Sequence, residues 1–63
     1  MKKYYSENNQ LNEILVNNGI DLICNERMEV IISNEDAERI KEIVKDMAPA
    51  AIDDYSIEDI TED

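Results

Sequence analysis

Carboxylates are the residues of this chain whose number and spacing suggest a chemical role. Four of them follow one another at intervals of three, four and four residues, and we name this set the acidic column: Glu35, Glu38, Glu42 and Asp46. On a helix, such intervals place side chains on one face, about 6 Å apart along the axis. A second group lies in the segment 52–63, which has no base and six acids: Asp53, Asp54, Glu58, Asp59, Glu62 and Asp63.

Carboxylates can bind metal ions, transfer protons or recognise a basic macromolecule. A calcium loop of the EF-hand type needs a glycine at its sixth position, and segment 53–63 has none. Acid–base catalysis needs a pocket that separates the pKa values of two carboxylates, which a chain of 63 residues is poorly suited to build. The chain has no histidine and a single glycine. We therefore expect no enzyme, no metal site and no cofactor.

The charge balance favours recognition of a basic protein. The chain has 16 acidic and 6 basic residues, a formal net charge of -10. Such a polyanion is repelled by nucleic acid phosphates and by anionic lipid surfaces, so we expect no direct contact with nucleic acid or membrane. The alternative is that the charge serves only to keep a small protein dispersed.

The residues of the acidic column require a helix to align them, and the sequence predicts one after Ser33. Ser33 or Asn34 can cap its first turn, where acids also favour the positive end of the helix dipole. Pro49 cannot continue the helix, which should therefore end near residue 47 or 48. The buried face is predicted from apolar residues at three- and four-residue spacings: Ala37, Ile40, Val44, Met47, Ala48 and Ala51.

Residues 6–18 are also interpreted as a helix, with Ser6 as its cap. Gly19 then fits the left-handed position after the helix, with Ile20 against Leu15 as in a Schellman ending. The alternative is a strand that turns through Asn18-Gly19, a pair typical of hairpins. The helix is the interpretation that we favour.

The alternation in segment 20–32 predicts a β-hairpin with a three-residue loop. Its register pairs Cys24 with Met28, and it buries Cys24 as a small hydrophobic residue. Two isoleucines, Ile23 and Ile31, fall on the other face and could be covered by a second copy of the chain, so a homodimer stays open.

The two ends complete the predicted fold. Tyr4 and Tyr5 belong to a short edge strand or a frayed end, and at least one should pack on the core. Residues 53–63 are predicted to form an acidic segment, either a short helical turn capped by Ser56 or a tail. The fold class is therefore α+β, with one domain over 1–52: a helix, a two-stranded antiparallel hairpin, a long amphipathic helix and the acidic segment. The N-terminus could add a third strand.

The function that we predict is that of a small acidic inhibitor or decoy. It would bind a basic, nucleic-acid-binding surface of a partner through nine residues: Glu35, Glu38, Glu42, Asp46, Asp53, Asp54, Tyr55, Glu58 and Asp59. The layout is similar to that of phage-borne inhibitors of host nucleases, including some anti-CRISPR proteins, an analogy of size and charge that assigns no residue.

Two other functions stay open. One is an adaptor or dimerising subunit that binds through five apolar residues: Ile23, Ile31, Tyr55, Ile57 and Ile60. The other is a subunit that is stable only inside a larger assembly. A single cysteine and the lack of a secretory signal lead us to expect a cytoplasmic protein.

Overall fold

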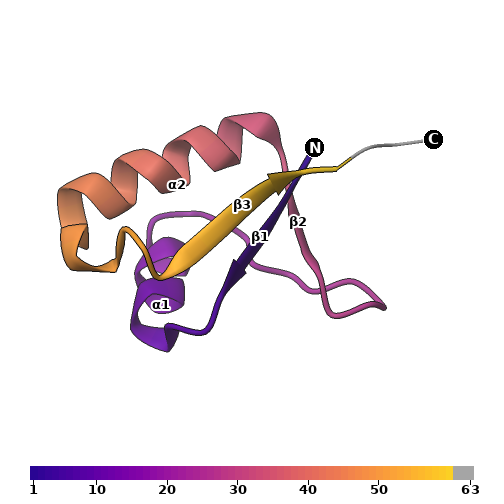
Figure 1. Ribbon diagram of the computed structural model, residues 1–63, viewed down its shortest axis with the longest axis horizontal. Coiled ribbons are helices and arrows are strands. Elements are labelled where there is room, and N and C mark those ends of the chain that lie inside the picture. The colour runs from indigo at the N-terminus through magenta and orange to yellow at the C-terminus, as the bar shows by residue number, and fades with distance from the viewer. Residues whose placement is uncertain (61–63) are drawn as a thin grey trace.

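Three antiparallel strands and two helices form the computed structural model (Figure 1), which describes residues 1–60. The elements, in chain order, are β1 (Lys2–Ser6), α1 (Asn9–Asn17), β2 (Val30–Ile32), α2 (Asn34–Met47), the 3-10 turn η1 (Pro49–Ala51) and β3 (Tyr55–Asp59). The predicted α+β class is confirmed.

The N-terminal strand lies at the centre of the sheet, whose order is β2-β1-β3. β1 pairs with β2 from Lys2–Ile32 to Tyr4–Val30. It pairs with β3 along its whole length. The predicted third strand is therefore confirmed, but its predicted place at an edge is wrong, because both other strands join it.

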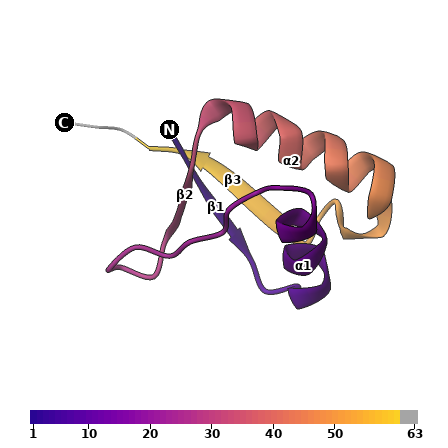
Figure 2. The same ribbon diagram turned by 180° about the vertical axis from the view of Figure 1, so that it is seen from behind.

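Both helices cover the same face of the sheet (Figures 1 and 2), as one cluster of buried side chains shows. The cluster takes residues from both helices, from two strands and from the turns: Tyr4, Leu11, Leu15, Ile20, Ile32, Ala37, Ile40, Val44 and Ala51. Met47, also predicted to be buried, is 58% exposed. The spacing of apolar residues identifies a helix face but does not say how far along that face the core extends.

The ends of α2 are fixed by the residues that the sequence indicates. The Ser33 hydroxyl accepts a hydrogen bond from the Asp36 backbone N–H at 3.0 Å, and Glu35 and Asp36 lie in the first turn. The helix ends at Met47, two residues before Pro49. The cap of α1 is Asn8, whose side-chain oxygen accepts a hydrogen bond from the Leu11 N–H. The predicted cap, Ser6, is instead the last residue of β1, so the helix begins later than predicted.

Helix α1 confirms the predicted helix and its Schellman ending. The Ile20 N–H donates to the Leu15 carbonyl at 3.0 Å, and the Gly19 N–H donates to the Val16 carbonyl at 3.1 Å. Gly19 has a φ of +89°. Leu15 and Ile20 are fully buried, so this ending also directs the chain back into the core.

The predicted hairpin is formed only in part. Its two arms run antiparallel but meet at a single bridge, Cys24–Val30, and not in the register that pairs Cys24 with Met28. Residues 30–32 pair with β1 instead. Cys24 is consequently exposed, which corrects its predicted burial, and Met28 is exposed as well. The alternation of apolar and polar residues in segment 20–32 did not indicate that β1 competes with the first arm of the hairpin for pairing with residues 30–32.

The acidic segment contains a strand where the sequence suggested a helical turn or a tail. Residues 55–59 form β3, in which Ser56 pairs with Tyr5 instead of capping a turn. Tyr55 and Ile57 alternate with exposed residues and pack against the core. The last three residues of the predicted segment, 61–63, lie outside the described residues.

We predict that Gly19→Ala lowers the free energy of unfolding by about 1–2 kcal/mol, because an L-residue is strained at this φ. Urea denaturation followed by circular dichroism measures the loss. Asn17→Ala, an exposed change within the last turn of α1, is the control. Equal stability of the two variants would contradict a requirement for the left-handed conformation.

Candidate functional site

The acidic column lies on the solvent side of α2, opposite the buried residues of the helix. All four of its side chains are exposed. Asp46 lies eleven positions after Glu35, which corresponds to about 16 Å of helix. Among residues 1–60, the only cation within 4 Å of the column is Lys41, 3.8 Å from Glu38. The sequence prediction thus placed these four carboxylates correctly on one face.

Arg39, a base in the middle of α2, is directed away from the column. One of its guanidinium nitrogens donates to the Asn18 carbonyl at 2.9 Å, and the other lies 3.7 Å from Asp36. The side chain therefore links α2 to the turn after α1. The column keeps most of its charge because this base contacts other groups.

Asp53 and Asp54 lie in the turn between η1 and β3, away from the sheet pairing. The Asp54 carboxylate accepts from the Asn8 side-chain amide at 3.2 Å, and the Asp54 carbonyl accepts from the Ser6 hydroxyl at 2.7 Å. Asp54 thus joins the start of β3 to the start of α1, although it is exposed, as is Asp53. One acid of this pair has a structural role.

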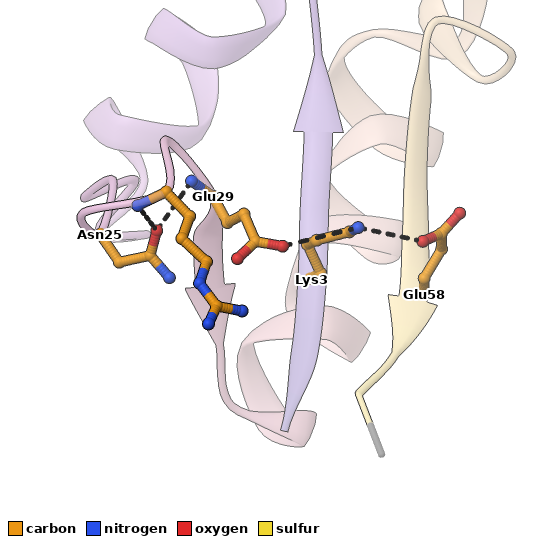
Figure 3. Close-up of polar contacts among 5 residues, drawn as sticks. Lys3, Asn25, Glu29 and Glu58 are labelled. Atoms are coloured by element: carbon orange, nitrogen blue, oxygen red, sulfur yellow. Dashed lines mark hydrogen bonds and ion pairs between the residues drawn. The ribbon is translucent and has the colours of Figure 1, made fainter. Parts of the chain in front are cut away.

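The two acids of β3 are paired with lysines of the central strand. Lys2 stands opposite Asp59 in the register, and its ammonium donates to that carboxylate. On the other face of the sheet, the Lys3 ammonium lies 3.4 Å from Glu58 and 3.7 Å from Glu29 (Figure 3). Glu58 and Asp59 are therefore partly neutralised, which the sequence prediction did not anticipate.

Tyr55, predicted to contact a partner, packs against the core. Its ring centroid lies 6.1 Å from that of Tyr4. Tyr4 is only 3% exposed, and its hydroxyl donates to the Asn12 side chain at 2.8 Å. Burial raises the pKa of the Tyr4 hydroxyl. The contacts of Tyr55 thus give it a structural role in packing the sheet on the core, and less of its side chain is exposed for binding a partner.

The structure contains an apolar groove that sequence reasoning missed. It encloses about 530 Å³ between the end of β1, helix α1 and the loop before β2, and we define it by six lining residues: Tyr5, Val16, Leu22, Cys24, Met28 and Val30. The available signal was Val16, an apolar residue off the buried stripe of α1. Cys24 was instead assigned to the core.

The structure of residues 1–60 bears on two further properties, metal binding and membrane spanning. In this part of the chain, no three potential metal-ligating side chains gather closely enough to hold an ion. Neither α1 nor α2 has the length and apolarity that a membrane-spanning helix requires. Comparison of the chain with models of protein families, with curated proteins and with solved structures finds no match.

The Lys2–Asp59 pair gives a pH-dependent prediction. The hydrogen bond and the charge of Lys2 hold the pKa of Asp59 below its ordinary value, so this contribution to stability is lost as the pH falls through the folded-state pKa. We expect Lys2→Met to raise the Asp59 pKa, as measured by carboxyl NMR against pH. Lys45→Met, on α2, is the control. An unchanged Asp59 pKa in Lys2→Met would refute the pairing.

Proposed function

We propose that this chain is a small, non-enzymatic inhibitor that binds a basic, nucleic-acid-binding surface of another protein. The contact would be the acidic column on α2, with exposed Asp53 as an additional acid. The observation that carries the proposal is the exposure of four carboxylates on one helix face, of which only Glu38 has a cation within 4 Å among residues 1–60. Glu58 and Asp59 would contribute less, because lysines lie beside them.

The mechanism would be competition by charge. Duplex DNA carries one charge per about 1.7 Å, whereas the column spreads four over about 16 Å of helix. The column would therefore replace a few phosphates of a bound duplex and not a long stretch. The formal charge of -10 would also accelerate encounter with a basic partner, and this effect weakens as salt increases.

The second candidate function is that of an adaptor or dimerising subunit that binds through apolar residues. Ile23, which is 74% exposed, favours it. The set predicted from the sequence does not form one surface, however, because Tyr55 and Ile57 pack against the core. An adaptor of this kind should bind its partner equally at low and high salt.

The test is affinity capture on the immobilised chain from a native extract, at low and high salt. We expect a basic partner to bind at low salt and to be displaced by duplex DNA, because both would occupy one surface. The double variant Glu42→Gln/Asp46→Asn should capture several-fold less of this partner, since each lost charge pair weakens the contact.

The matched control is Asp21→Asn/Glu26→Gln, which removes the same charge from exposed positions outside α2. It should retain capture. Equal losses in the two double variants would mean that net charge, not the column, determines binding. A partner that resists both high salt and saturating DNA would contradict the inhibitor proposal and favour the adaptor.

A further inference from the structure

The apolar groove brings together exposed side chains from three separate parts of the chain. Tyr5 comes from β1, Val16 from α1 and Met28 from the loop before β2, and they are 58%, 54% and 80% exposed. Apolar residues scattered singly over a surface are ordinary, whereas a groove lined mainly by apolar side chains is typical of a binding site. The groove therefore needs a physical explanation of its own.

The groove exists because β2 is shorter than β1. The pairing of β1 with β2 stops at Tyr4–Val30, whereas β1 continues to Ser6. On that side, the space beside Tyr5 is bounded by α1 and by the loop. The Ser6 carbonyl accepts a hydrogen bond from the Asn12 side chain at 3.3 Å, so α1 satisfies a backbone group that lies beyond the β2 pairing.

The loop that carries Met28 is held by hydrogen bonds that involve Asn25, two of which its side chain accepts (Figure 3). The Asn25 side-chain oxygen accepts from the Arg27 N–H at 2.8 Å and from the Glu29 N–H at 3.0 Å. The Asn25 N–H donates to the Glu29 carbonyl, and the Met28 N–H donates to the Asn25 carbonyl. The loop thus has a defined conformation.

This conformation places Met28 at a φ of +63°, which a residue with a side chain rarely adopts. The strain is retained although the Met28 side chain is the most exposed large hydrophobic group of residues 1–60. Methionine is also an adaptable contact residue, because its side chain is flexible and polarizable. Residues held in sparsely populated backbone conformations cluster at active sites and ligand-binding sites.

The charge that lines the groove indicates the chemistry of its occupant. Glu13 is the one charged residue that lines it, and no lysine or arginine does. Glu7 lies at the Tyr5 end, where it accepts a hydrogen bond from the Tyr5 hydroxyl at 2.8 Å. A second copy of the chain would bring the same formal charge of -10, which opposes self-association.

We propose that the groove binds an amphipathic, basic segment of a partner protein. An apolar side chain of that segment would occupy the groove between Val16 and Met28, and flanking lysines or arginines would face Glu13. This surface is distinct from the acidic column, because no residue of α2 lines it. The proposal therefore stands independently of the inhibitor function.

NMR of the chain with labelled methionine methyl groups tests this proposal. Met28 reports on the groove, and Met47, next to Asp46, reports on the acidic column. The probes are a peptide of leucine and lysine and an oligolysine of equal charge. We expect the leucine–lysine peptide to shift the Met28 resonance and oligolysine to leave it unchanged, because only the former can fill an apolar groove.

Two variants and a matched control complete the test. Val16→Lys should raise the Kd of the leucine–lysine peptide about tenfold, because the substitution removes an apolar contact and its positive charge repels the peptide. Met28→Asn should also weaken it while keeping the backbone, because Asn tolerates positive φ. Ile52→Lys, at an exposed position outside the groove, should change the Kd by less than about twofold.

Three results would overturn the proposal. One is a Met28 resonance that does not respond to the leucine–lysine peptide or responds equally to oligolysine. Another is an equal effect of Val16→Lys and Ile52→Lys. The third is a Met28 methyl resonance that shifts as the concentration of the chain alone increases, together with a dimer detected by sedimentation. That result would mean that a second copy of the chain occupies the groove. A different result would contradict the role of the acidic column. In that case the double variant Glu42→Gln/Asp46→Asn would bind oligolysine as well as the unchanged chain does.

Discussion

The pairing of both outer strands with β1 is the constraint on which the rest of the structure depends. β2 and β3 are far apart in the sequence, and each reaches the sheet only through this central strand. Tyr4, in the middle of β1, joins the sheet to the buried core below both helices. Without β1, the short segment 30–32 would have only the bridge to Cys24, and a pairing that short is marginal in water.

The same strand determines how the negative charge is distributed. β1 carries Lys2 and Lys3, and its register places them opposite Asp59 and Glu58. Exposed ion pairs contribute little to stability, but these pairs reduce the effective charge along β3. On α2, by contrast, three carboxylates have no cation within 4 Å among residues 1–60, in part because Arg39 contacts the turn after α1: Glu35, Glu42 and Asp46.

The two surfaces that we associate with binding have different physical origins. The acidic column is a local feature, since a helix aligns side chains three and four residues apart wherever it forms. The apolar groove is a tertiary feature, because its walls come from β1, α1 and a loop. A partner that used both would combine long-range attraction with a short-range apolar contact, and these two terms respond differently to salt.

The sequence by itself determined the features that depend on neighbouring residues. Ser33 and Pro49 predicted the limits of α2, and Gly19 predicted the end of α1, because caps and left-handed residues act within a few positions. The apolar spacing predicted that Ala37, Ile40 and Val44 are buried, and the same helix then exposes the acidic column.

Only the tertiary structure decided the features that depend on competition between distant segments. Residues 30–32 pair with β1, whereas the predicted hairpin keeps a single bridge, Cys24–Val30. Tyr55–Asp59 is a strand because β1 offers it a partner. Alternation shows that a segment suits a sheet, but the free energy of pairing depends on which strand is available beside it. For that reason the exposure of Met28, the lysine partners of β3 and the apolar groove could be found only in the folded chain.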